Sequence, residues 1–158
     1  MKCLTCGTAV EYTPSLGLKG VDCDFEYKNV GEWYDAQYDY LRSLDYEEIK
    51  GKALFTDVCR ISEVIVCKRK QLVDKCAELS LYHNAIIFKL SDGEEHKLRF
   101  DAISVMSVLG RNKLNIYVGK QIFQIKGDKR FSALKYVNLF YLYRSRKGDE
   151  KNGEFLGL

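Results

Sequence analysis

The sequence has 158 residues, of which 46% are hydrophobic and 30% are charged, and it contains one proline. This composition predicts a folded globular domain and excludes an intrinsically disordered chain. The net charge of +3 permits an anionic partner but lacks the basic excess typical of a dedicated nucleic-acid binder. No apolar run approaches the about 20 residues that a membrane-spanning helix needs. At this length we expect one domain, or one domain with a small appendage.

Residues 1–30 are turn-rich and contain half of the six cysteines. Three cysteines and one glutamate have the spacing of the ligands in a four-cysteine zinc ribbon: Cys3, Cys6, Cys23 and Glu26. Three thiolates and one carboxylate can complete a tetrahedral zinc shell, with Asp22 or Asp24 as alternatives to the glutamate. The segment therefore predicts a small zinc-ribbon-like unit with a structural zinc, or equally a degenerate ribbon without metal.

The other three cysteines, Cys59, Cys67 and Cys76, lie within strand-like runs. A reduced cysteine in such a run behaves as a small hydrophobic residue. A chain of this length can also build a core without disulfides. We therefore expect the protein in the reducing cytoplasm, where peripheral contact with the inner face of the membrane is compatible with this composition.

Residues 31–51 predict a helix that connects the ribbon to the remainder of the chain. Trp33, Gln37 and Leu44 recur at helical spacing, and Gly51 is a plausible stop. Three tyrosines lie on the other side of this helix: Tyr34, Tyr38 and Tyr46. One helix face is enough for a core, so we expect the second aromatic face to meet another surface.

Residues 53–125 contain seven or eight short β-rich runs, separated by turn signals such as "SDGEE" and "GRNK". Close spacing without long crossovers predicts an antiparallel meander. A final helix is predicted over 128–144, with Asp128 as its N-cap, and we expect it to plug an open end of the sheet. The fold class is therefore α+β, mainly β, with a domain over 52–145 and a flexible tail over 146–158.

This order of elements resembles the pleckstrin-homology (PH) architecture. The stretch "AELSLYHNAIIFK" and the later "KLRFDAISVMSVLGRNKLNIYVGKQIFQIK" resemble the GRAM-like members of that superfamily. The resemblance implies a PH/GRAM-like antiparallel β-barrel or sandwich of about seven strands. A C-terminal helix would cap it, and the small cysteine ribbon and one helix would precede it.

A motif in the predicted helix indicates a more specific group of proteins. It consists of Glu32, Trp33, Tyr34 and Gln37. This chain resembles the C-terminal extension of bacterial 1-acylglycerol-3-phosphate (lysophospholipid) acyltransferase-like proteins. That extension consists of a zinc ribbon, a "(D/E)WYxxQ" helix and a PH-like domain. Two departures are the glutamate in place of the fourth cysteine and the lack of the acyltransferase domain in this sequence. The resemblance implies a non-catalytic accessory module that positions or regulates an acyltransferase domain, present in cis or in trans.

His96 and Asp101 have the His-x-x-x-x-Asp spacing of such acyltransferases. They lie in a strand-like segment, where residues five apart point to opposite faces and are separated by about 16 Å. We interpret the spacing as a coincidence and predict no catalytic residue in this chain.

A basic triplet, Lys68, Arg69 and Lys70, lies in a predicted loop between two strands. Lysine and arginine neutralise phosphorylated headgroups, and each contributes about 1 kcal/mol near an anionic leaflet. The triplet predicts contact with anionic lipid; a solvated loop is the alternative interpretation.

An alternative function is protein–protein interaction through the aromatic helix faces. The candidate contact residues are Trp33, Tyr34, Gln37 and Phe140. Mutual packing of the ribbon, the helices and the β-domain would also account for the surplus of aromatic residues. Nucleic acid is not an expected partner, because the chain lacks a basic groove studded with aromatic residues.

Overall fold

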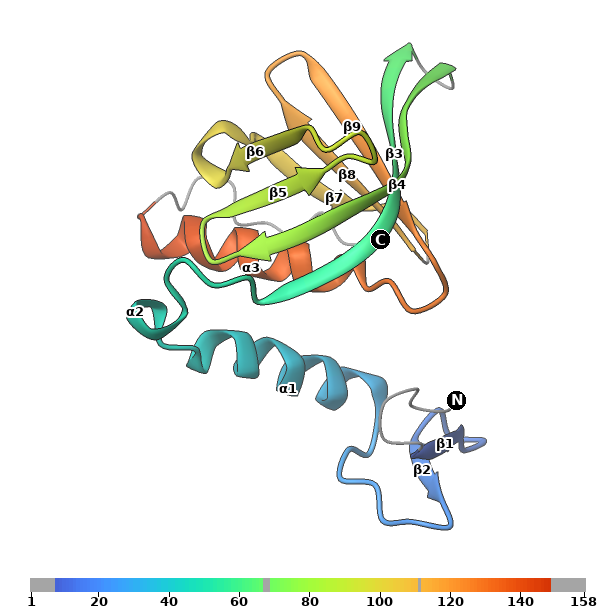
Figure 1. Cartoon of the computed structure of the whole chain (residues 1–158). Helices are drawn as coiled ribbons and strands as arrows, with labels where there is room; N and C mark the ends of the chain where they lie inside the picture. Colours follow the sequence, from blue (N-terminus) through green and yellow to red (C-terminus); the bar gives the residue numbers. More distant parts are fainter. Residues whose placement is uncertain (1–7, 67–68, 111, 149–158) are drawn as a thin grey trace. The chain divides into compact units, whose positions relative to one another are not determined.

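The computed structural model describes residues 8–66, 69–110 and 112–148 (Figure 1). The chain divides into two compact units, Met1–Leu44 and Asp45–Leu158. Within its described part, the N-terminal unit consists of an antiparallel hairpin and one helix: β1 (Ala9–Tyr12), β2 (Leu18–Val21) and α1 (Val30–Ser43). No helix among the described residues is long and apolar enough to span a membrane.

The side chains of Asn29 and Glu32 cap the start of α1. The Asn29 side chain accepts a hydrogen bond from the Glu32 backbone N–H at 2.9 Å, and the Glu32 carboxylate accepts from the Asn29 side chain at 3.0 Å. The same carboxylate accepts from the Lys28 backbone N–H at 2.7 Å. These bonds satisfy N–H groups that have no partner inside the helix, so α1 begins at Val30.

The single helix expected over 31–51 is interrupted. Leu44 is extended (ψ 127°), and Asp45 caps a separate short helix, α2 (Tyr46–Ile49), by accepting from the Glu47 N–H at 2.9 Å. Aspartate competes for nearby backbone N–H groups, which favours a helix start over a helix interior. The boundary between the two units falls at this interruption.

The described part of the C-terminal unit contains a seven-stranded antiparallel sheet in the order β6-β5-β4-β3-β9-β8-β7. Its strands are β3 (Phe55–Val66), β4 (Arg69–Tyr82), β5 (Ala85–Lys89), β6 (Glu95–Arg99), β7 (Val105–Val108), β8 (Lys113–Val118) and β9 (Gln121–Gly127). A 3-10 turn over Phe100–Ala102 links β6 to β7. The prediction of a mainly β, antiparallel meander is confirmed.

The C-terminal helix, α3 (Ala133–Arg146), packs its apolar residues into the same core as the alternating apolar residues of the strands (Figure 1). The Tyr136 hydroxyl donates to the Asp57 carboxylate on β3 at 2.6 Å, and the Lys135 ammonium lies 2.7 Å from that carboxylate. Burial, and then the bond to Asp57, raises the pKa of the Tyr136 hydroxyl. The predicted C-terminal helix is therefore confirmed, and a buried polar contact ties it to the sheet.

Two details of α3 differ from expectation. Ser132 occupies the N-cap position without a side-chain bond, whereas Asp128 accepts from the Arg130 and Phe131 N–H groups in the preceding turn. Phe140, expected as an exposed contact residue, is completely buried and meets the Phe100 ring edge-on at 5.5 Å. The prediction of Phe140 as an interaction residue is therefore wrong. Most of the tail expected over 146–158 lies outside the described residues.

Candidate functional site

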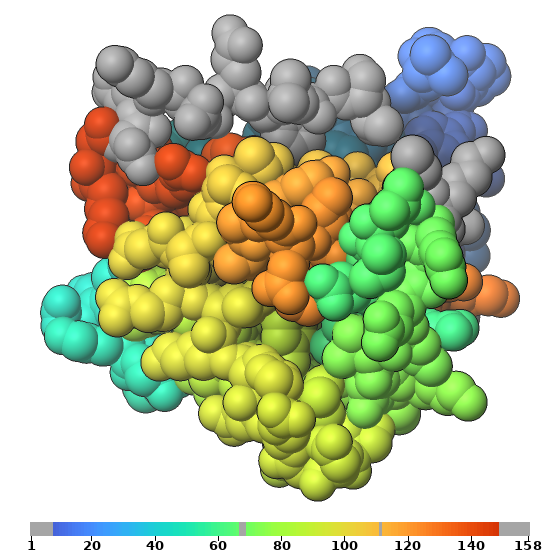
Figure 2. Space-filling view, turned by 90° about the horizontal axis from the view of Figure 1, so that it is seen from above, coloured from blue at the N-terminus to red at the C-terminus, as the bar shows by residue number. Residues whose placement is uncertain are grey.

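The hairpin of β3 and β4 extends beyond the rest of the sheet as a two-stranded ribbon (Figure 1). β3 pairs with β9 only through Cys59–Glu63, and β4 pairs with β5 only through Glu78–Tyr82. Residues 64–66 and 69–73, which we call the ribbon end, therefore pair only within the β3–β4 hairpin and with no other strand. In the space-filling view the green ribbon stands beside the orange surface of β8 and β9 (Figure 2).

Four branched apolar side chains are exposed at the ribbon end. Their exposed fractions are 49% for Ile65, 63% for Val66, 38% for Leu72 and 41% for Val73. Exposed apolar residues that gather at one place, and on an element without further strand partners, mark a contact site for another surface.

The basic triplet predicted as a lipid site is only partly brought together here. Lys68 lies outside the described residues. Arg69 is exposed at the ribbon end, opposite Val66, and makes no ion pair with any described residue. The Lys70 ammonium instead donates to the Gln124 side chain on β9, and Gln124 donates to Asn115 on β8 at 2.9 Å. Arg69 therefore lies with the apolar side chains of the ribbon end, whereas the Lys70 side chain reaches β9 of the same sheet.

Sequence reasoning missed the apolar part of this site. Val64, Ile65 and Val66 are three consecutive apolar residues, and the basic triplet and then Leu72 and Val73 follow. A strand with one buried face alternates apolar and polar residues. The consecutive apolar residues on both sides of a basic turn were the available signal.

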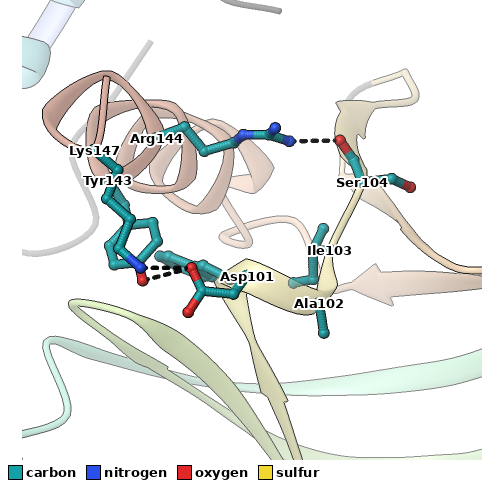
Figure 3. A pocket seen from close by; sticks show the side chains of 8 residues that line it. Asp101, Ala102, Ile103, Ser104, Tyr143, Arg144 and Lys147 are labelled. Atoms are coloured by element: carbon teal, nitrogen blue, oxygen red, sulfur yellow. Dashed lines mark hydrogen bonds and ion pairs between the residues drawn. The ribbon is translucent and has the colours of Figure 1, made fainter. Parts of the chain in front are cut away.

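A pocket of about 250 Å³ lies between the 3-10 turn and the end of α3 (Figure 3). The Asp101 carboxylate accepts from the Tyr143 hydroxyl at 2.8 Å and from the Lys147 ammonium at 2.9 Å. These two bonds, that of Lys147 first, hold the pKa of Asp101 below its usual range. Arg144 donates to the Ser104 carbonyl at 3.0 Å. The polar groups of this pocket bond to one another, so they fasten the end of α3 to the 3-10 turn and to Ser104.

His96 and Asp101 have separate partners in the structure. The His96 imidazole lies 3.2 Å from the Glu94 carboxylate, whereas Asp101 is bound to α3. The spacing in the sequence therefore does not assemble a His–Asp pair.

Two of the four predicted zinc ligands, Cys3 and Cys6, lie outside the described residues. Cys23 is an exposed free thiol with its Sγ 3.9 Å from the Ala9 carbonyl oxygen, and Glu26 is also exposed. Across residues 8–66, 69–110 and 112–148, no three His, Cys, Asp or Glu residues form a group that could hold a metal. The zinc site therefore stays a prediction.

The helix motif contributes to packing within the N-terminal unit. The half-buried Trp33 ring meets Phe25 edge-on at 5.8 Å, and Phe25 meets Tyr27 at 5.5 Å. The Gln37 amide donates to the Trp33 carbonyl at 3.1 Å within α1. Tyr34 is half exposed. Of the predicted contact residues on this helix, Tyr34 and Gln37 remain on the surface.

No protein-family model matches the chain, and no curated protein matches its sequence. Among solved structures, it is similar to the N-terminal PH domain of the human ARAP2 protein, with 13% identity and a TM-score of 0.44 over 58% of this chain and 81% of that one. It is also similar to the C-terminal domain of an unknown protein from Leishmania infantum, with 14% identity and a TM-score of 0.39 over 73% of this chain and 98% of that one. The observed strand order, and not these distant similarities, defines the fold.

Proposed function

We propose that this chain is a non-catalytic module that attaches peripherally to an anionic membrane surface through the ribbon end. One observation carries the proposal: four exposed apolar side chains stand at the end of a ribbon that also carries Arg69. The apolar side chains would enter the boundary between headgroups and acyl chains, while the guanidinium would pair with anionic headgroups.

The expected strength of this attachment is modest. Complete burial of a valine, leucine or isoleucine side chain contributes about 1.5–3 kcal/mol, so the half-exposed side chains at the ribbon end would each recover about 1 kcal/mol. One arginine near an anionic leaflet adds about 1 kcal/mol. A total of about 5 kcal/mol gives weak and reversible binding, which suits a module that orients a larger assembly at the bilayer.

The test is sedimentation of the full chain with vesicles of phosphatidylcholine alone and of phosphatidylcholine with phosphatidylserine. We expect binding to the anionic vesicles, and weaker binding for Arg69→Gln than for the control Lys97→Gln on the edge strand β6. Equal binding to neutral and anionic vesicles, or equal losses in the two variants, would count against the proposal.

We further propose that the module serves a lysophospholipid acyltransferase-like protein, with the acyltransferase domain supplied in cis or in trans. The sequence of Glu32, Trp33, Tyr34 and Gln37 behind the cysteine ribbon supports this assignment. Co-purification of the chain with such a domain tests it. Failure to associate under conditions that preserve vesicle binding would separate the two proposals.

Protein–protein interaction through α1 is the second candidate function. Tyr34 and Tyr40 are 50% and 59% exposed, which is unusual for large aromatic side chains. Tyr34 belongs to the helix motif and Tyr40 does not, so Tyr40→Glu is the matched control for Tyr34→Glu. Loss of the acyltransferase partner in the first variant alone favours a contact through the motif. Equal partner binding by both variants excludes it.

A further inference from the structure

Tyr46, the first residue of the short helix α2, contacts two elements that lie far from it in the sequence. Its ring meets the His83 imidazole edge-on, with the ring centroids 5.9 Å apart. The Arg146 guanidinium lies 3.9 Å from the centroid of the same ring, a distance at which a cation is attracted to the π face. His83 belongs to the turn between β4 and β5, and Arg146 ends α3. The Tyr46 side chain therefore packs α2 against both of these elements.

The remainder of α2 contributes little to this attachment. A helix of four residues is too short to be stable in water without packing. Its other residues are exposed, except for the half-buried Ile49. The cap at Asp45 is a hydrogen bond within the segment and does not reach the sheet. Just before β3, the Leu54 N–H donates to the Leu81 carbonyl at 2.8 Å. Packing of the Tyr46 ring therefore holds the segment before Leu54 against the sheet.

The surroundings of the His83 ring favour its neutral form. The Nδ1 atom is buried and makes no hydrogen bond with any residue that the structure describes. A charged imidazole carries a proton on both nitrogens, so protonation would leave a buried donor without a partner. The neutral ring avoids this cost, because it can leave Nδ1 unprotonated.

The charged groups around His83 also oppose protonation. Burial of the ring, and then Lys50, lowers the pKa of His83 below its ordinary value of 6.5. Lys50 of α2 and Lys97 of β6 repel a charged imidazole, whereas Glu47 of α2 attracts it. On the side of α3, the Arg146 guanidinium lies against the tyrosine ring and contributes a further positive charge. His83 is therefore neutral when α2 is docked at neutral pH.

We propose that Tyr46 and His83 form an acid-sensitive latch, which holds α2 on the sheet at neutral pH and releases it when His83 is protonated. Protonation would place a charged and buried donor near two lysines, and release of α2 would expose that donor to water. Release would free residues 45–53, because Leu54 donates the bond to the sheet that follows them. A segment of this length spans at most about 30 Å when it is extended. The latch would thereby regulate the length of chain that joins the two compact units.

The direction of the pH dependence follows from proton linkage. The pKa of His83 is lower when α2 is docked than when it is released, so the released state binds more protons. Docking is therefore strongest above pH 6.5 and weakens as the pH falls below that value toward the lowered pKa. Because one proton is exchanged, the docking equilibrium changes by up to about tenfold per pH unit in this window. The latch does not depend on attachment of the ribbon end to a membrane, so either proposal can fail without the other.

The experiment is an NMR titration of the full, isotope-labelled chain from about pH 8 to about pH 5. The chain has two histidines, so His96 is the internal control for His83. Heteronuclear NOE values of the α2 amides report the order of this segment. We expect these values to fall as His83 is protonated, in the parent chain and in His96→Gln, while those of the sheet stay constant. In His83→Gln the α2 values should not depend on pH.

Further variants test the same coupling in the opposite direction. Tyr46→Ala removes the ring that docks α2 and should raise the midpoint of the His83 titration toward 6.5, because linkage is reciprocal. Lys50→Gln removes a positive charge near His83 and should also raise the midpoint. Lys52→Gln is the matched control, since it removes the same charge from an exposed position beyond α2 and should leave the midpoint unchanged.

Several results would overturn the proposal. One is that the α2 amides keep their NOE values while His83 is protonated. Another is that these values fall at the same pH in His83→Gln as in the parent chain. A simultaneous loss of order in the sheet would show general acid unfolding in place of a latch. An unchanged His83 midpoint in Tyr46→Ala would show that the two side chains are not coupled.

Discussion

Val66→Ser is the sharpest perturbation of the proposed membrane contact. Val66 is 63% exposed near the end of β3, so its side chain contributes little to the packed core. Burial of a complete valine side chain contributes about 1.5–3 kcal/mol, and the exposed two thirds would recover about 1 kcal/mol in the membrane boundary. Replacement by serine should therefore weaken binding to anionic vesicles about fivefold, since 1 kcal/mol corresponds to about that factor.

The assay is titration of the chain with anionic vesicles, followed by sedimentation. Leu109→Ser is the matched control, because Leu109 is 45% exposed and lies after β7, away from the ribbon end. The melting temperatures of both variants should stay close to that of the parent chain, as is usual for exposed positions. Equal binding by Val66→Ser and Leu109→Ser would refute the reasoning.

The interior and the N-terminal segment provide three further tests. Tyr136→Phe removes the bond to Asp57 and should lower the free energy of unfolding by about 1–2 kcal/mol in urea titrations; a change below about 0.5 kcal/mol would contradict this. Burial raises the pKa of the Cys59 thiol from 9.0 to about 12, so its contribution to stability is complete below pH 9.0 and is lost as the pH rises toward 12. Cys59→Ala should show a shallower loss of stability over that range, and identical slopes would contradict the shift. Metal analysis of the reduced chain should find about one zinc per chain if Glu26 or a neighbour completes the shell. Free thiols without zinc would show a degenerate ribbon.

Local patterns predicted the strands and the C-terminal helix. The β-rich runs alternate apolar residues that the structure buries, such as Leu79 and Leu81 on β4. The interruption at Asp45 was missed because the apolar spacing of the helix continues past it, whereas a local side-chain bond to the Glu47 N–H decides the break. Helical periodicity alone therefore does not predict a helix break at a residue whose side chain can cap a new helix.

The orientation of α3 depended on contacts distant in the sequence. The helix carries aromatic residues nearly all round, so periodicity alone did not select its buried face. Tyr136 is buried because Asp57, 79 residues away, accepts its hydroxyl hydrogen bond. That arrangement places Phe140 in the core as well.

The candidate sites were predicted in part. The sequence predicted a basic turn between two strands, and the structure places Arg69 at the end of that hairpin. Strand register also pairs Arg60 on β3 with Lys126 on β9, across 66 positions of sequence. Sequence patterns do not contain such pairings, because they follow from the order of all seven strands in the described sheet.

Fluorescence quenching by brominated lipids tests the central claim most directly. The chain contains one tryptophan, so a Trp33→Phe background permits a single probe through Val66→Trp or, as control, Leu109→Trp. With anionic vesicles, we predict a blue shift and quenching of the probe at position 66 and neither change at position 109. Vesicle binding without quenching of the probe at position 66 would contradict insertion of the ribbon end.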